Sequence, residues 1–324
     1  MSPSLSRTAP IDGLLLVYKP RGVTSKDVSR WFQRRLGKIK MGHVGTLDPI
    51  AEGLLPVLFG KATRIQDFLL SGTKTYEFDI SFGSATDTLD ADGEIVAHAS
   101  SEHVSETQLQ DICTSLIGDF LQTPPLYSAI KFKGKPLYEY TRQGKSDQIP
   151  LQDLKKVVKI ESLVCLNYAS NIGTFRIRCA KGTYVRVVGS QIAELAGTLG
   201  TITRLLRLGS GSLDVKQAFT LDQIEPMLDQ LNSFIIPIEK IDLSIPNWRS
   251  MDENLIVHLK MGQEMLVQMT VFESGLGNNG ERRATIRSLD HVILIDNNGR
   301  TFGIGSALVL NTGRIAVRMR RGLS

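Results

Sequence analysis

A glycine-rich stretch, GHVGTLDP at residues 42–49, is the segment of this chain best suited to chemistry. Its glycines allow the backbone to approach a ligand closely, because they carry no Cβ. Pro49 disfavours helical geometry at the preceding residue, so Asp48 is expected in an extended or turn conformation. A carboxylate in such a loop is a candidate nucleophile or base. The alternative is a turn residue that bonds its own backbone, which is common for Asp-Pro turns.

Three further segments carry side chains that could act with Asp48. In KGTYVR (181–186), Arg186 could pair with Asp48 and stabilise its charged form, or form only a surface ion pair. In KTYE (74–77), Tyr76 could stack on a base, or belong to the core as most aromatics do. The Tyr, Lys and Arg residues between 124 and 145 suit a nucleic-acid loop, or an amphipathic helix with surface lysines.

Hydrophobic patterning predicts the elements that position these segments. Strands are expected over 13–18, 54–59, 76–82, 157–166 and 174–179, and helices over 25–36, 62–70, 106–116, 185–199 and 221–231. Residues 42–53 are expected to form a loop. Because strands and helices do not alternate regularly, we predict an α+β fold with a mixed, mainly antiparallel central sheet and flanking helices.

The C-terminal part of the chain predicts a second, smaller domain. Strand patterns cover 283–288, 291–296 and 301–304, and the Asn298-Gly299 turn indicates a hairpin between the last two. A boundary is expected between Pro237 and Pro246. We therefore predict a flexible tail over residues 1–10, a body over 11–245 and a β-rich domain over 246–324.

Composition and charge narrow the classes of protein. The 324 residues have a formal net charge of +5, with basic clusters in residues 1–75 and 301–324 and an acidic stretch over 76–120. Such clusters could form a nucleic-acid footprint or solvated surface. The apolar runs are too short for a membrane helix, and residues 1–10 do not read as a secretory signal. Three scattered cysteines and five histidines form no disulfide framework and no zinc motif. We expect a cytoplasmic protein.

Five ordered motifs resemble the B-type (TruB-like) family of tRNA pseudouridine synthases. They are GHVGTLDPIAEGLLPV (42–57), KTYEF (74–78), TDTLDADG (86–93), PPLYSAIKFKGKPLYEYTRQG (124–144) and KGTYVR (181–186). The resemblance covers residues 11–245. The segment FGIGSALVLNTGRIAVRMRR (302–321) resembles the PUA-like module of these enzymes more weakly, and residues 254–280 match nothing known to us.

The resemblance implies a pseudouridine synthase catalytic domain over 11–245, with an RNA-clasping insertion at about 124–150, and a PUA-like RNA-binding domain over 246–324. It implies isomerisation of uridine 55 in the T-loop of tRNA by base flipping, without cofactor or metal. The expected partner is the tRNA T-arm, with no membrane and no obligate protein partner. The long insertion and the compact N-terminus resemble the stand-alone bacterial form, and a monomer is expected.

The resemblance also implies residue roles. Asp48 would be the catalytic carboxylate, acting either as a nucleophile or by abstracting a proton next to C1′, with Arg186 as its partner. Tyr76 would stack on the flipped base and relay a proton. The remaining substrate-binding residues are His43, which would fill the space left by the base, Tyr184 and Leu205, which would line the base pocket, Lys131 on the insertion, and Lys19 below the pocket floor.

One position departs from the family pattern. An Arg-Arg pair usually follows the pocket leucine, whereas Leu206 and Arg207 follow Leu205 here.

Two other functions remain open from the residues alone. One is a non-catalytic RNA-binding or tRNA-folding module, and the other is a nucleoside-bond hydrolase or base-exchange enzyme.

Overall fold

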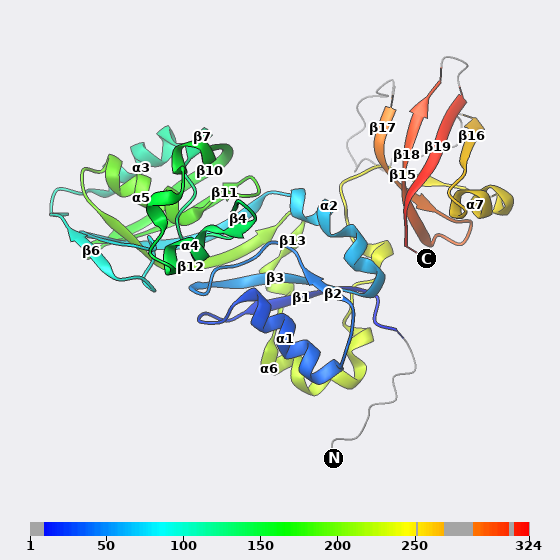
Figure 1. Cartoon of the computed structure of the whole chain (residues 1–324), viewed down its shortest axis with the longest axis horizontal. Coiled ribbons are helices and arrows are strands. Elements are labelled where there is room, and N and C mark those ends of the chain that lie inside the picture. The colour runs from blue at the N-terminus through cyan, green and yellow to red at the C-terminus, as the bar shows by residue number, and fades with distance from the viewer. Residues whose placement is uncertain (1–9, 251, 269–287, 311–313, 324) are drawn as a thin grey trace.

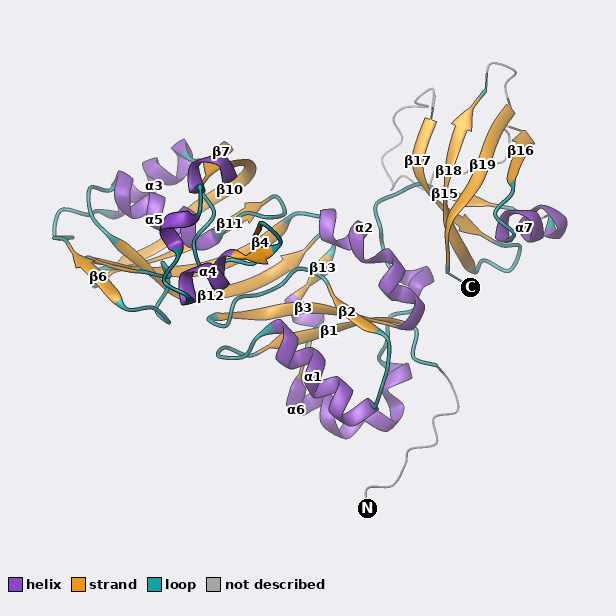
Figure 2. Ribbon diagram, in the orientation of Figure 1, coloured by secondary structure: helices purple, strands orange, loops and turns teal. Residues whose placement is uncertain are grey.

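The computed structural model describes residues 10–250, 252–268, 288–310 and 314–323. A large mixed sheet dominates the body, and a five-stranded sheet forms the C-terminal part (Figures 1 and 2). The large sheet has the order β14-β1-β3-β12-β4-β11-β10-β7, with β2 beside β3 and β13 beside β12. Its strands are β1 (Gly13–Lys19), β2 (Met41–His43), β3 (Ala51–Phe59), β4 (Lys74–Phe82), β7 (Gly118–Gln122), β10 (Lys156–Ala169), β11 (Ile172–Cys179), β12 (Gly200–Ser210), β13 (Leu213–Asp214) and β14 (Phe219–Thr220).

Most neighbouring strands of this sheet run antiparallel. The parallel pairs are β1 with β14 and β3 with β12. Two short hairpins lie outside the sheet, namely β5 (Ser84–Thr86) with β6 (Ile95–His98) and β8 (Lys131–Phe132) with β9 (Lys135–Pro136). The mixed, mainly antiparallel sheet predicted from the sequence is confirmed.

Helices cover both faces of the sheet. The α-helices are α1 (Ser25–Leu36), α2 (Gln66–Ser71), α3 (Glu106–Ser115), α4 (Leu137–Arg142), α5 (Val185–Leu195), α6 (Leu221–Ile224) and α7 (Glu253–Lys260). The 3₁₀ helices are η1 (Gly60–Ile65), η2 (Ser146–Gln148), η3 (Leu151–Leu154), η4 (Val215–Gln217), η5 (Glu225–Ser233) and η6 (Ile238–Lys240).

Strand β1 is buried on both faces, which explains its continuous apolar run. Leu15 and Val17 share a core with α1, α3 and α5, whereas Leu14 and Leu16 pack into a second core with η1, α2 and the segment 241–243. Alternate residues of a strand point to opposite faces, so both sets must be apolar when both faces are covered.

Helix α1 begins and ends as the sequence predicts. Thr24 Oγ1 accepts from the Asp27 N–H at 3.1 Å, and the Asp27 carboxylate accepts from the Thr24 N–H at 2.9 Å, which completes a capping box. The Thr24 hydroxyl also donates to the Asp27 carboxylate at 2.6 Å, and this bond together with the one from the Thr24 N–H lowers the pKa of Asp27 to about 2. The helix ends at Gly37, which has a φ of 73°.

The predicted loop over 42–53 is partly wrong. Residues 41–43 form β2 and β3 begins at Ala51, so the loop covers only residues 44–50. The glycines made this stretch look irregular, but Gly53 is a sheet residue with a φ of 98°. A Cβ there would lie 2.5 Å from the Arg207 carbonyl oxygen on the neighbouring β12, so the strands can approach only at glycine.

Other element boundaries also differ. The helix predicted over 185–199 ends at Leu195, and the next residues lead into β12, which the patterning missed. Two register shifts against β4 interrupt the alternation of β12, which removes the usual strand signal. The helix predicted over 62–70 is η1 followed by α2, and that over 221–231 is α6 followed by η5, where Pro226 lies in the first turn.

The C-terminal sheet has the order β15-β17-β18-β19-β16 and its own core, which includes Trp248 and Phe302. Its strands are β15 (Asn247–Arg249), β16 (Glu264–Gln268), β17 (Ser288–Ile295), β18 (Thr301–Val309) and β19 (Arg314–Gly322). The predicted hairpin is present between β17 and β18, and the curled sheet is consistent with a PUA-like domain. The predicted tail at 1–9, the strand at 283–287 and residues 269–280 lie outside the described residues. No helix in the described ranges is long and apolar enough to cross a membrane.

Candidate active site

Ser25 of α1 holds the loop that carries Asp48 through hydrogen bonds to the backbone of Leu47. The Ser25 hydroxyl accepts from the Leu47 N–H at 2.9 Å and lies 3.2 Å from the Leu47 carbonyl oxygen. The Asp48 carbonyl accepts from the Ala51 N–H at 3.1 Å. The turn expected at Asp-Pro is therefore present, but backbone atoms close it and the carboxylate is left to project into the site.

The Asp48 carboxylate pairs with Arg186, as the sequence suggested. Arg186 Nη2 lies 2.8 Å from Asp48 Oδ2, and Nη1 lies 3.3 Å from Asp90 Oδ2. The guanidinium also donates to the carbonyls of Thr88 and Tyr127, at 2.7 and 3.0 Å. These four partners hold Arg186 in one orientation, and its charge stabilises an adjacent carboxylate anion.

Asp90 is a site residue that the sequence analysis missed. Burial raises its pKa, and the bonds from Thr88 and the charge of Arg186 oppose this rise. The two carboxylates on Arg186 therefore differ, because the Asp48 side chain is 38% exposed and that of Asp90 only 7%. The TDTLDADG motif pointed to this segment, but the sequence does not show which of its acidic side chains is buried at the site.

A cavity of about 240 Å³ opens beside Asp48. Tyr76 comes from β4, Tyr184 from the start of α5 and Leu205 from β12, and all three predicted pocket residues line this cavity with Asp48 and Arg186. Burial raises the pKa of both tyrosines, so their hydroxyls are protonated at neutral pH. The cavity thus combines aromatic walls with one carboxylate.

Arg207 closes the floor of this cavity, and the sequence analysis assigned it no role. Its side chain is buried and donates to the carbonyls of Leu54 and Gly45, at 2.6 and 3.0 Å. Burial lowers the pKa of Arg207. The sequence could have indicated this role, because Arg207 follows Leu205 by two residues on one strand and residues i and i+2 of a strand share a face.

His43 lies at the end of β2 and borders a second cavity of about 640 Å³, which meets the first at Asp48. Burial lowers the pKa of His43, and the charges of Arg207 and Lys26 act in the same direction. The ring is therefore neutral at neutral pH. Its Nε2 lies 3.4 Å from Thr46 Oγ1.

The two predicted lysines lie in different places. Lys19 is fully buried and donates to the carbonyls of Pro20, Val23 and Pro49, at 2.9, 2.7 and 3.4 Å. Burial lowers the pKa of Lys19 to about 8. Through the bond to the Pro49 carbonyl, Lys19 holds the backbone that follows Asp48. Lys131 lies exposed on β8 and borders neither cavity, so its role stays a prediction.

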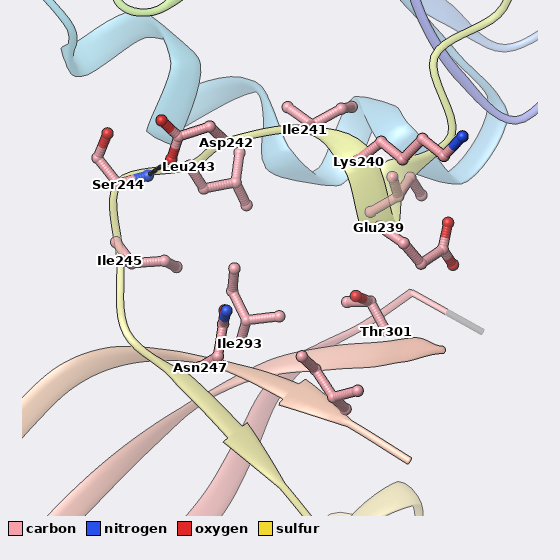
Figure 3. Close-up of a pocket in the computed structure, with 12 residues that line it drawn as sticks. Glu239, Lys240, Ile241, Asp242, Leu243, Ser244, Ile245, Asn247, Ile293 and Thr301 are labelled. Atoms are coloured by element: carbon pink, nitrogen blue, oxygen red, sulfur yellow. Dashed lines mark hydrogen bonds between the residues drawn. The ribbon is translucent and has the colours of Figure 1, made fainter. Parts of the chain in front are cut away.

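Side chains of both charges line the second cavity. Lys26 and Arg30 of α1, and Tyr138 and Arg142 of α4, lie there with Asp27, Asp90 and Asp92. Arg30 is paired with Asp27, whereas Lys26 and Arg142 are exposed cations suited to contact the phosphates of a polyanion that extends past Asp48. Another cavity, of about 460 Å³, lies between the segment 238–245 and the C-terminal sheet (Figure 3) and shares no lining residue with the two at Asp48.

Comparison with solved structures identifies the fold. Solved structures with the titles "Crystal Structure of a Cbf5-Nop10-Gar1 Complex" and "Structure of H/ACA RNP bound to a substrate RNA containing 2'-deoxyuridine" each match with a TM-score of 0.71. They are 22% and 20% identical, and the matches cover 97% and 96% of this chain and 85% of each matched chain. The chain therefore shares the fold of these structures.

Sequence comparison narrows the class. Residues 33–185 match the family described as "TruB family pseudouridylate synthase (N terminal domain)". Relatives named tRNA pseudouridine synthase B include one from Geobacillus thermodenitrificans, 38% identical over 75% of this chain and 82% of the relative. Another, from Aromatoleum aromaticum, is 36% identical over 91% of this chain and 88% of the relative. The chain belongs to the TruB family of pseudouridylate synthases, which are RNA-modifying isomerases.

Proposed function

We propose that the chain converts uridine to pseudouridine in tRNA, at position 55 of the T-loop, with Asp48 as the catalytic carboxylate. Family membership and the naming of the relatives support isomerisation in tRNA. The observation that carries the assignment of Asp48 is its place at the junction of two cavities, 2.8 Å from a buried arginine.

The chemistry needs one carboxylate and no second substrate. The C1′–N1 bond breaks, the uracil turns and a C1′–C5 bond forms, while C5 loses a proton and N1 gains one. Asp48 could attack the sugar or the base, or abstract a proton next to C1′. Arg186 would stabilise the Asp48 anion in each case. No cofactor or metal enters this scheme.

The uridine must be extruded from the T-loop, and this requirement suggests roles for the residues around Asp48. A stacked uridine must leave the T-loop before it can react, which costs a few kcal/mol. Tyr76 would stack on the extruded base and relay a proton, and Tyr184 and Leu205 would complete the walls of the smaller cavity. His43, a neutral and half-buried ring at the junction with the larger cavity, would fill the vacated space.

The outer parts of the chain would hold the RNA. Residues 11–245 would be the catalytic domain, and residues 246–324 a PUA-like RNA-binding domain, a division supported by the start of β15 at Asn247. The insertion at 124–150, with Lys131, would close over the T-arm, while Lys19 supports the floor. We propose a cytoplasmic enzyme that acts as a monomer without an obligate protein partner.

The test is position-resolved pseudouridine mapping on unmodified tRNA. Wild type should modify position 55, and Asp48→Asn should bind tRNA but form no product. The matched control is Asp111→Asn, at an exposed position of α3. Turnover by Asp48→Asn would overturn the assignment. Release of free uracil would indicate a hydrolase, and RNA remodelling without product in wild type would indicate a non-catalytic RNA-binding module.

A further inference from the structure

Helix α2 lies between the body and the C-terminal domain (Figure 1), and one side of it is held by that domain. Arg321 of β19 pairs with Asp67 at 2.9 Å and donates to the Arg64 carbonyl at 2.7 Å. The Arg321 guanidinium also lies 5.6 Å from the centre of the Phe68 ring. Asp67 and Phe68 lie in the first turn of α2, and Arg64 lies in η1, which leads directly into α2, so Arg321 contacts both helices at their junction.

Two further contacts join this junction to the C-terminal domain. The Arg64 guanidinium donates to the Gly322 carbonyl, and the Phe68 ring meets the edge of the His291 ring with centroids 5.0 Å apart. Next to them, Leu323 packs into the core that holds Ile65 and Leu69. The C-terminal domain thus fixes the position of α2 through polar, aromatic and apolar contacts.

The other side of α2 faces the active site. Gln66 and Leu70, four residues apart, lie next to His43 in the wall of a cavity of about 400 Å³. The Gln66 side-chain amide donates to the His43 carbonyl at 3.1 Å. Leu70 also lines the cavity that contains Tyr76. One short helix therefore contacts the C-terminal domain on one face and the active site on the other.

The His43 carbonyl depends on Gln66 because of the pairing of β2. The Val44 N–H bonds the Pro56 carbonyl and the Gly60 N–H bonds the Lys40 carbonyl, so even-numbered residues make the ladder bonds between β2 and β3. In an antiparallel pair the odd-numbered residues then point their polar groups away from β3. Gln66 bonds this outward carbonyl and so fixes the end of β2 that carries His43.

We propose that α2 couples the C-terminal domain to the active site, with Gln66 as a positioning residue for His43 and Arg321 as the residue that positions α2. The inference rests on the proposed function, because it assumes that His43 acts in base extrusion. Lys74 closes the other end of α2 by donating to the Gly72 carbonyl at 2.7 Å and lies 3.4 Å from the carbonyl oxygens of Leu69 and Leu70. The helix is thus held at both ends.

The first test removes the hydrogen bond and keeps the length of the side chain. In full-length Gln66→Met, the single-turnover rate at saturating tRNA should fall about five-fold, the effect of one hydrogen bond. The dissociation constant for tRNA should stay as in wild type, and the melting temperature should fall by no more than about 2–4 °C, because one hydrogen bond contributes about 1 kcal/mol. A fluorescent adenine analogue next to the target uridine should show slower base extrusion, and Gln66→Met should add nothing to His43→Ala.

The second test breaks the contact with the C-terminal domain from the side of the body. Asp67→Ala removes a negative charge, so it cannot weaken phosphate binding, yet the rate should fall about two- to five-fold. Arg321→Ala should have the same effect on the rate. In the Gln66→Met background, neither change should lower the rate further. Arg249→Ala is the control, because the Arg249 side chain donates to the carbonyls of Asp296 and Asn297 in its own domain.

The outcomes separate the two proposals. An active Asp48→Asn variant overturns the proposed function. If Asp48→Asn is inactive but Gln66→Met keeps the wild-type rate of base extrusion and turnover, the coupling through α2 is wrong. Fully additive effects of Gln66→Met and Asp67→Ala also overturn it, because the two residues would then act independently.

Discussion

The Arg186 guanidinium lies 2.8 Å from the Asp48 carboxylate, and the two side chains differ sharply in exposure, at 4% and 38%. The buried arginine is fixed by Asp90 and by the carbonyls of Thr88 and Tyr127, while the carboxylate of Asp48 faces open cavities. A substrate can therefore reach Asp48 without displacing the charge that stabilises it. This arrangement is preorganised, because the arginine does not have to reorient when the reaction begins.

Replacement of Arg186 tests this arrangement. Arg186→Lys keeps a positive charge but loses at least one charge-assisted hydrogen bond, so the single-turnover rate should fall about ten- to a hundred-fold. Arg186→Met leaves the buried Asp90 carboxylate without a cation beside it and should also lower the free energy of unfolding by about 3 kcal/mol. Denaturant unfolding and rapid-quench assays measure both effects. Wild-type kinetics in Arg186→Lys would contradict the positioning role.

Tyr76 offers a test of base stacking. Tyr76→Leu keeps an apolar side chain but loses the aromatic face, which should slow turnover about ten- to a hundred-fold, the usual contribution of one stacked base. Tyr76→Phe retains the ring and isolates the hydroxyl. A Tyr76→Leu variant that turns over at the wild-type rate would show that Tyr76 is only a core aromatic.

Gly53 tests the close approach of β3 and β12. In Gly53→Ala, the new Cβ would meet the Arg207 backbone at a φ of 98°, so the free energy of unfolding should fall by about 2 kcal/mol or more. The matched control is Gly134→Ala, at a φ of 82° with open space around its Cβ position. Thermal unfolding of both variants isolates the steric part, and equal losses would mean that backbone strain alone is responsible.

Lys19 should make stability depend on pH in the alkaline range. Its pKa falls from 10.5 to about 8 on folding, so the unfolded chain holds more protons between these values. The free energy of unfolding should therefore rise with pH from about 8 to 10.5, by up to about 3 kcal/mol from this group. The same change in Lys19→Met should be smaller. Urea unfolding at several pH values measures the difference, and parallel curves would contradict it.

Two exposed cations at the larger cavity, Lys26 and Arg142, predict that the affinity for tRNA depends on salt. Each phosphate contact adds about 0.7–0.9 to the slope of log affinity against log salt. Lys26→Met and Arg142→Met should each reduce that slope by roughly this amount and leave the rate at saturating tRNA close to wild type. Filter binding at several salt concentrations measures the slope. Unchanged slopes would place the RNA elsewhere.

The sequence alone determined most of the larger elements and the residues able to do chemistry, although it missed β2 and β12. Local patterns define β1, β4 and the β10–β11 pair, and the capping box at Thr24 defines α1, because each signal involves neighbouring residues. The motifs around Asp48 and Arg186 also predicted their pairing, which the structure contains. Patterning failed where tertiary contacts replace local rules, as at the bulged β12 and at Gly53.

Only the tertiary structure decided which polar groups are buried together. Three polar residues look like ordinary surface residues in the sequence, because their partners are distant along the chain. Asp90 pairs with Arg186, and Arg207 donates to the carbonyls of Gly45 and Leu54. Gln66 donates to the carbonyl of His43. A buried polar side chain needs a hydrogen-bond partner, but that partner is a backbone or side-chain atom brought close by strand pairing. The exposure of Asp48 between two cavities arises in the same way, because the segments that carry Asp48, Asp90 and Arg186 are distant in the sequence and pack together in the fold.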